Sequence, residues 1–144
     1  MQISSRFTIA VHIFVCINTF ECNEKVTSKF LAGSINTNPV IVRQIVSMLK
    51  LKGLVNSSRG SSGITIAKDP SEITLLDIFQ AVDLIDNGEL FNFHDNPSQE
   101  CPVGKNIHSI LDDKLCCFQK ALEKKLESVT LDDLFESAKT YIDL

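Results

Sequence analysis

The sequence predicts a mainly α-helical protein with one small β-hairpin. Along most of the 144 residues, apolar side chains recur at intervals of three and four, which is the spacing of one face of a helix. Over residues 54–66, two short apolar segments instead flank a segment rich in Ser and Gly, which is typical of a β-hairpin. The 44% apolar and 22% charged residues are those of an ordinary globular domain.

The first helix is expected over residues 3–20, with Ser4 or Ser5 as its N-cap. Apolar residues cover more than half of its circumference, which suits a central helix that packs against several neighbours. They include Phe7, Ala10, Val11, Phe14 and Ile17.

Residues 27–54 are expected to form two helices joined by a short turn. Thr27 would cap the first helix, and Asn38 would cap the second, with Pro39 at the first helical position, where a missing N–H costs nothing. The second helix has one apolar face and one polar, partly basic face. This pattern is typical of a helix-turn-helix whose second helix enters the major groove of DNA, although an ordinary helical hairpin would share it.

The predicted β-hairpin follows directly and carries Arg59 near its tip, among Ser and Gly residues. A lone arginine on such a loop is usually just solvated. Behind a helix-turn-helix it has a specific use, because a hairpin in this place acts as a wing whose arginine lies along the DNA backbone or enters a minor groove. The two features together predict a winged helix-turn-helix.

Charge is divided unevenly between the two halves of the chain. Residues 1–68 hold eight basic and two acidic side chains, whereas residues 69–144 hold six basic and sixteen acidic ones, and the total is -4. The basic half contains the helix-turn-helix, as expected for a module that contacts phosphates, although a merely uneven surface would look similar.

Two similar phrases, ITLLDIF at 73–79 and VTLDDLF at 129–135, mark two further helix starts. Each fits a capping box, in which Thr74 pairs with Asp77 and Thr130 with Asp133. Helices are therefore expected near 75–85 and 131–141.

Between these starts, residues 84–104 are expected to form a long irregular loop, and residues 105–128 a long amphipathic helix. The apolar stripe of this helix is longer than a small domain needs to cover its own core, so we expect a second subunit to pack on it. The predicted dimerisation stripe consists of Ile107, Leu111, Leu115, Phe118, Leu122 and Leu126. The expected organisation is a DNA-binding domain over 1–83, a candidate sensor loop over 84–104, and a dimerisation helix with a C-terminal helix over 105–144.

Other classes of protein are not favoured. Five cysteines without regular spacing do not form a disulfide framework, and the apolar run 7–20 is too short and too polar to be a membrane span. No nucleophile elbow, phosphate-binding loop or acid–base constellation is present, so we expect no enzyme. We expect a cytoplasmic protein with reduced thiols.

The cysteines and histidines do not favour a metal site, but one cysteine is a candidate redox sensor. His94, Cys101 and His108 match no common zinc spacing, so we expect no metal site. Cys101 precedes Pro102 beside a helix start, where the helix dipole could lower the thiol pKa, and it is a candidate redox sensor. The adjacent Cys116 and Cys117 are expected to be buried small hydrophobic residues.

The chain resembles the Rrf2-type winged helix-turn-helix transcription regulators of bacteria, which include an iron–sulfur cluster regulator, a nitric-oxide sensor and a cysteine-metabolism repressor. The resemblance covers nearly the whole chain. It depends on IVRQIVSMLKLKGLVNSSRGSSGITIAK, on EITLLDIFQAVD and on the closing helix followed by SVTLDDLF.

The resemblance implies a homodimer that binds a partly palindromic operator. It places DNA contacts at the hairpin tip and on the two helices of the helix-turn-helix: Ser28, Lys29, Thr37, Asn38, Val40, Arg43, Gln44, Ser58, Arg59 and Gly60. Arg43 stands where relatives carry Glu, and since arginine donates to guanine whereas glutamate accepts from cytosine, a different operator is implied.

Cluster-binding members of that family place three cysteines and a histidine in the long loop. Here only Cys101 stands at such a position, with Asp95, Glu89 and Gly104 at the others. Because thiolates hold iron–sulfur clusters, we expect no cluster. The expected function is sequence-specific DNA binding that represses transcription, with thiol control at Cys101 as a further hypothesis. The alternative is a winged-helix module that binds another protein.

Overall fold

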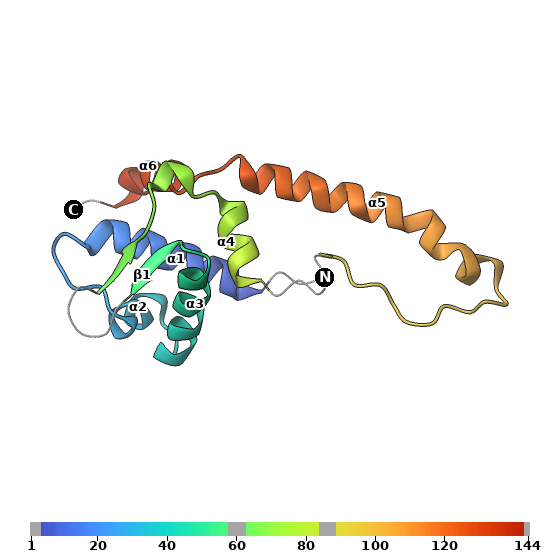
Figure 1. Ribbon diagram of the computed structural model, residues 1–144, viewed down its shortest axis with the longest axis horizontal. Helices are drawn as coiled ribbons and strands as arrows, with labels where there is room; N and C mark the ends of the chain where they lie inside the picture. The colour runs from blue at the N-terminus through green and yellow to red at the C-terminus, as the bar shows by residue number, and fades with distance from the viewer. Residues whose placement is uncertain (1–3, 58–62, 84–88, 143–144) are drawn as a thin grey trace.

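The computed structural model describes residues 4–57, 63–83 and 89–142. In these ranges a helical body carries a two-stranded wing on one side, and one long helix projects from it as an arm (Figure 1). The elements, in chain order, are α1 (Ser5–Phe20), α2 (Ser28–Ile35), α3 (Pro39–Leu51), β1 (Val55–Ser57), β2 (Ile64–Ile66), the 3-10 turn η1 (Pro70–Glu72), α4 (Leu75–Val82), α5 (Pro102–Glu127) and α6 (Leu131–Tyr141). The predicted mainly α fold with a small wing is confirmed.

Side-chain caps fix where the two helices of the helix-turn-helix begin. The hydroxyl of Thr27 accepts a hydrogen bond from the N–H of Phe30 at 3.1 Å, and Oδ1 of Asn38 accepts one from the N–H of Val40 at 2.8 Å. Asn36 ends α2 in the left-handed conformation, with φ of 60°. Asparagine tolerates this conformation better than most residues, so the turn between α2 and α3 needs no glycine.

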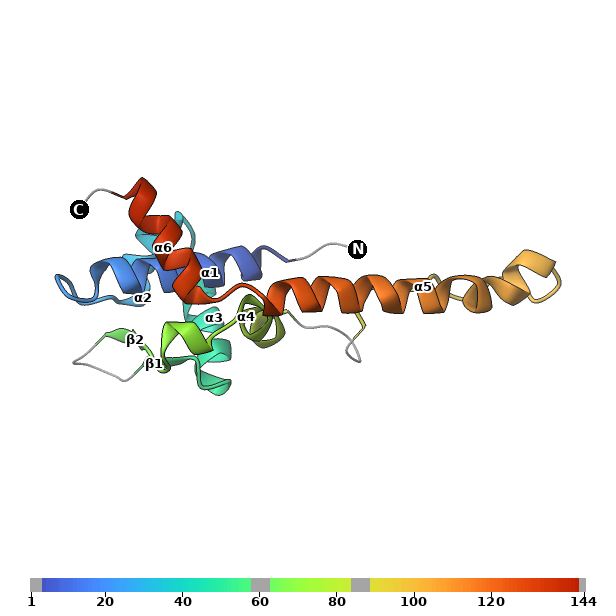
Figure 2. The ribbon, with the colours of Figure 1, turned by 90° about the horizontal axis from the view of Figure 1, so that it is seen from above.

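Helix α1 is the centre of the body, as its apolar circumference predicted. Figure 2 shows α6 crossing it on one side, and it also packs against α2, α3, α4 and β2. Its fully buried side chains are Ala10, Ile13, Phe14 and Ile17. Because α3 and β2 both pack against α1, this helix fixes the direction in which the reading helix and the wing face.

The wing is an antiparallel pair in which Val55 lies opposite Ile66 and Ser57 opposite Ile64. Gly63 has a φ of 72°, and a Cβ at this position would lie 2.8 Å from the carbonyl oxygen of Val26. That carbonyl also accepts a hydrogen bond from the N–H of Ile64 at 2.8 Å. Only glycine fits this approach, which joins the base of the wing to the start of the helix-turn-helix.

Helix α6 returns to the body after the long helix. It packs against α1 and η1, and its Leu131 and Phe135 are part of the core. Both predicted capping boxes are present, at Thr74 with Asp77 and at Thr130 with Asp133. Figures 1 and 2 agree that α6 lies over the body and that α5 points away from it.

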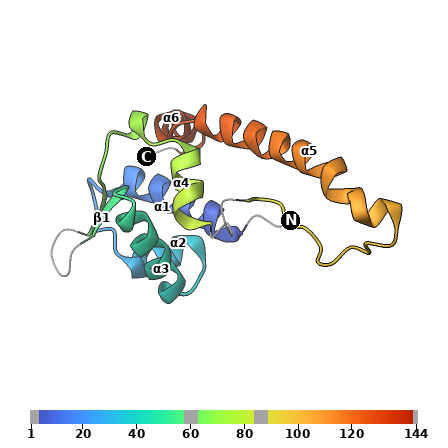
Figure 3. The same cartoon turned by 45° about the vertical axis from the view of Figure 1, so that its right-hand side comes forward.

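Helix α5 starts at Pro102, earlier than the expected residue 105, because proline suits a first helical position and Cys101 occupies the N-cap. None of its 26 residues is buried. The preceding segment, residues 89–101, runs outward from the body beside the arm to its far end, where α5 begins, as the turned view of Figure 3 also shows. No helix in the described ranges is long and apolar enough to cross a membrane.

Candidate nucleic-acid interface

The first two turns of α3 present a mixed polar and apolar surface. Val42, Ile45, Val46 and Leu49 face the core, so the opposite side of the helix is turned to solvent. On that side Arg43 and Gln44 are exposed, and Val40 is 47% exposed. Side chains at the start of a reading helix contact base edges, and these three types can bind guanine, adenine and the thymine methyl group respectively.

Sequence reasoning missed Ile41, a large hydrophobic residue that is 40% exposed beside Val40. Its place outside the apolar stripe of α3 was the available signal. Asn38 is exposed, but its Oδ1 caps α3, which leaves its amide N–H groups free to donate to a base or a phosphate.

The N-terminus of α2 offers a second contact region. Lys29 is exposed, whereas Ser28 and Thr37 are half-buried. A shallow hollow of about 630 Å³ runs beside this helix and is lined in part by Lys25, Thr27 and Lys29. Two lysines beside a helix N-terminus suit a DNA phosphate, because the N–H groups and the helix dipole favour an anion there.

The wing stands next to α3. The ammonium group of Lys50, in the last turn of α3, donates a hydrogen bond to the carbonyl of Ser57 at 2.6 Å, which ties the reading helix to β1. The predicted contacts at Ser58, Arg59 and Gly60 lie outside the described residues. Their neighbours Ser57 and Ile64 are paired strand residues, so the hairpin predicted around them is present.

The predicted dimerisation stripe lies along the exposed arm α5. Phe118 is 58% exposed, and the other five members are half-buried. Two large hydrophobic residues outside the predicted set, Val103 and Ile110, are 62% and 50% exposed. Cys116 and Cys117 are also exposed, so the expectation that they are buried is wrong for the single chain, because they lie on an arm of which no residue is buried.

Cys101 is exposed at the N-cap of α5. The backbone N–H of Gly104 and, less strongly, that of Val103 lower the pKa of its thiol, because they favour the negative thiolate. The two histidines that flank it in sequence do not join it. Both His94 and His108 stack on the ring of Phe93, at 4.8 and 3.9 Å between ring centroids. In the described ranges no three His, Cys, Asp or Glu side chains are grouped to hold a metal ion.

The comparisons with known proteins agree with this geometry. The family model described as "Rrf2: Iron-dependent Transcriptional regulator" matches residues 3–137. The "Putative HTH-type transcriptional regulator YwnA" of Bacillus subtilis (strain 168) is 41% identical over 133 residues, which are 92% of this chain and 96% of that protein.

Solved structures show the same fold. One described as "a putative DNA binding protein" has 38% identity and a TM-score of 0.71, over 90% of this chain and 98% of that one. The B. subtilis cysteine regulator CymR has 23% identity and a TM-score of 0.66, over 94% and 97% of the two chains, and shows likeness of fold alone. The family match and the 41% identity show that this chain belongs to the Rrf2 family and is a DNA-binding transcription regulator.

Proposed function

We propose that this regulator acts as a homodimer on a partly palindromic operator and represses the adjacent genes. The observation that carries the proposal is the arm: α5 runs for 26 residues and none of them is buried. Because bacterial DNA lies in the cytoplasm, the proposal implies a cytoplasmic protein, and it assigns no enzymatic activity.

A second copy is the occupant that best suits the arm. Burying the exposed parts of Val103, Ile110 and Phe118 against a partner would contribute on the order of 1 kcal/mol each. A two-fold dimer pairs the same surface on both chains, and it would carry two α3 helices that read two half-sites related by the same symmetry.

Each half-site would be read by the N-terminal turns of α3. Arg43 is proposed to donate to guanine, and Val40 with Ile41 to contact thymine methyl groups. Lys29, Ser28 and Thr37 would hold phosphates, and Arg59 of the wing would lie along the backbone or in a minor groove. The basic charge of residues 1–68 favours this orientation toward DNA.

We propose that no iron–sulfur cluster of the three-cysteine, one-histidine kind is bound, although the family description contains the words "Iron-dependent". Cys101 is the single thiol between residues 84 and 104. At the position expected for the histidine, Gly104 packs on the backbone of Ser98 so closely that a Cβ would lie 3.0 Å from the Ser98 nitrogen and closer still to its carbonyl oxygen. A histidine does not fit there in this loop conformation. Iron and sulfide analysis of anaerobically purified protein tests the proposal, and a stoichiometric cluster would refute it.

A thiol signal at Cys101 is a separate proposal. Its exposure and lowered pKa both favour reaction with an oxidant such as a peroxide. Operator affinity measured with and without peroxide tests it, with Cys101→Ser as the insensitive control. Unchanged affinity of the oxidised protein would end this proposal and leave the DNA-binding one intact.

Selection of bound duplexes from a random pool tests the main proposal. We expect a partly palindromic consensus whose binding weakens steeply with added salt, because phosphate contacts release counterions. Arg59→Ala should reduce both the affinity and the salt dependence. If no sequence is enriched and binding has no salt dependence, the surface of α3 and the wing would instead serve a protein partner.

A further inference from the structure

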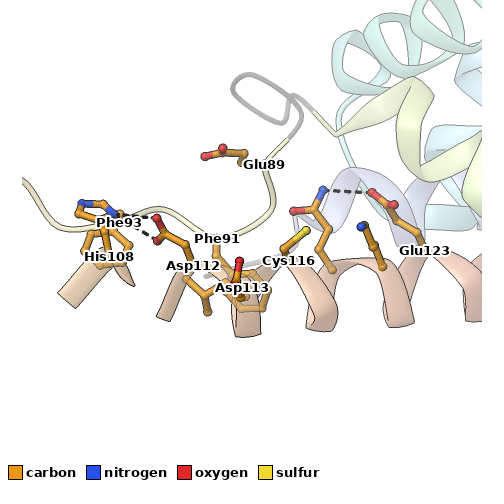
Figure 4. Close-up of a pocket in the computed structure, with 11 residues that line it drawn as sticks. Glu89, Phe91, Phe93, His108, Asp112, Asp113, Cys116 and Glu123 are labelled. Atoms are coloured by element: carbon orange, nitrogen blue, oxygen red, sulfur yellow. Dashed lines mark hydrogen bonds and ion pairs between the residues drawn. The ribbon is translucent and has the colours of Figure 1, made fainter. Parts of the chain in front are cut away.

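The segment 89–93 is held on α5 at two places and leaves a hollow between them (Figure 4). At one end, the N–H of Leu90 donates a hydrogen bond to Oε1 of Gln119 at 2.9 Å. At the other end, the ring of Phe93 stacks on that of His108 at 3.9 Å between centroids. The hollow has a volume of about 580 Å³, which is the size of a small-molecule site.

The shape of the hollow is elongated. On the α5 side its lining runs from His108 to Glu123, which is about 22 Å of helix at a rise of about 1.5 Å per residue. A ligand that fills it therefore lies parallel to α5. The middle of the wall is apolar, with Phe91 from the loop and Leu115 from the helix. This arrangement suits an aliphatic chain between polar ends.

The rim of the hollow is strongly acidic. Its lining contains four carboxylates but only one lysine, Lys120, and one histidine, His108. The carboxylates are those of Glu89, Asp112, Asp113 and Glu123. Oδ1 of Asp112 lies 3.1 Å from Nδ1 of His108, and Oε1 of Glu123 accepts from the amide of Gln119 at 3.1 Å. The side-chain carboxylates of Glu89 and Asp113 make no hydrogen bond or ion pair with any residue in the described ranges.

The carboxylates are spread along the hollow, and this spacing indicates what kind of cation the hollow can bind. Asp112 and Glu123 are separated by about 16 Å of helix, and the described residues hold no group of three ligands that could share a metal ion. Several positive charges spaced along a flexible chain match this distribution better than one compact divalent ion. We propose that the hollow binds linear aliphatic polyamines, whose ammonium groups pair with the carboxylates while the methylene chain lies against Phe91 and Leu115.

The site is compatible with the proposed dimer and does not depend on DNA binding. It lies on the face of α5 next to the predicted dimerisation stripe, and Leu115 is the one residue that the stripe and the lining share. A partner on the stripe would thus leave the carboxylates accessible. Binding can be measured without an operator, so its failure and a failure of DNA binding are separate results.

The cysteines provide an internal test. Cys116 lines the hollow, whereas Cys22 is exposed on the body and Cys117 is exposed outside the lining. The full chain is alkylated with iodoacetamide at constant ionic strength, and each cysteine is followed by peptide mass spectrometry. Spermidine at about ten times its dissociation constant should slow the alkylation of Cys116 by about tenfold and leave the alkylation rate of Cys22 unchanged.

Two paired variants make the test specific. Glu89→Gln with Asp113→Asn should abolish the protection, whereas Glu127→Gln with Asp132→Asn removes the same charge outside the hollow and should preserve it. Two ligand controls complete the design: octane-1,8-diol has the apolar chain without charge, and Mg²⁺ has charge without the chain. Absence of protection by spermidine, equal protection by either control ligand, or equal loss in both variants would overturn the proposal.

Discussion

Thr74 and Thr130 lie opposite each other in an isolated antiparallel bridge. The N–H of Leu75 donates to the carbonyl of Val129, and the N–H of Leu131 donates to the carbonyl of Ile73, both at 2.9 Å. The two similar phrases in the sequence therefore meet in space, and α4 and α6 begin side by side. This bridge attaches the segment that follows α5 to the segment that precedes α4, so the chain rejoins the body at the end of the arm.

Loss of a cap at this bridge should destabilise the body. Thr130→Ala removes the hydroxyl that accepts from the N–H of Asp133 at 3.2 Å, and such a loss costs about 1 kcal/mol of unfolding free energy. Urea unfolding followed by circular dichroism measures it. Thr140→Ala, an exposed position near the end of the same helix, is the control, and equal effects of the two variants would contradict the assigned role.

Arg43→Ala should weaken operator binding and relax the preference for one base. A bidentate arginine–guanine contact contributes about 1–3 kcal/mol of discrimination, which is a loss of roughly fivefold to 150-fold in affinity. Fluorescence anisotropy with a matched set of duplexes measures it. Lys139→Ala removes an equal charge from α6, and it should leave base preference unchanged.

A carboxylate introduced into the apolar stripe of α5 should prevent dimerisation. Phe118→Glu places a carboxylate within the predicted dimerisation stripe, and because Phe118 is 58% exposed in the single chain, the monomer should still fold. Sedimentation at micromolar concentration should then find a monomer. Leu51→Glu, at a hydrophobic residue that is 85% exposed on the body, should remain dimeric. A wild-type monomer would refute the proposed assembly.

Cys101 should be alkylated at a lower pH than an ordinary exposed cysteine. The N–H groups of Gly104 and Val103 lower its pKa, so the reactive thiolate is present at pH values where Cys22 is still largely protonated. Alkylation rates of the two thiols against pH measure the difference. Coincident profiles would show that the helix start has no effect on this thiol.

Asp83 should make the protein less stable as pH rises through the acidic range. Burial raises the pKa of its carboxyl, against the opposing effects of the Ser4 N–H and the Arg6 charge, and its Oδ2 is buried without a hydrogen-bond partner among the described residues. The folded chain therefore holds the proton more tightly than the unfolded one, and stability falls between the ordinary aspartate pKa of about 3.9 and the raised value.

The Asp83→Asn variant tests whether the Asp83 carboxylate lowers stability as pH rises. It should gain unfolding free energy relative to the wild type at neutral pH, and the gain should disappear below the ordinary aspartate pKa. Denaturant titrations of both proteins across this range give the comparison. A gain that is constant with pH would show that the carboxyl charge is not its cause.

The sequence by itself determined the local structure. Caps at Thr27, Asn38, Thr74 and Thr130 and the periods of the apolar residues predicted every α-helix in the described ranges, because these signals act within a few residues of the chain. The short 3-10 turn η1 was not predicted. The boundary of α5 was misplaced, since the proline that begins it also reads as the end of a loop.

The tertiary structure alone decided how distant segments meet. Thr74 and Thr130 pair, α6 returns to α1, and Phe93 stacks on His108, which leaves the acidic hollow beside α5. Alternating aromatics at Phe91 and Phe93 in a polar loop were the one local sign of that site. Which residues face each other across such contacts depends on the packing of the whole chain, and no pattern within a few residues specifies it.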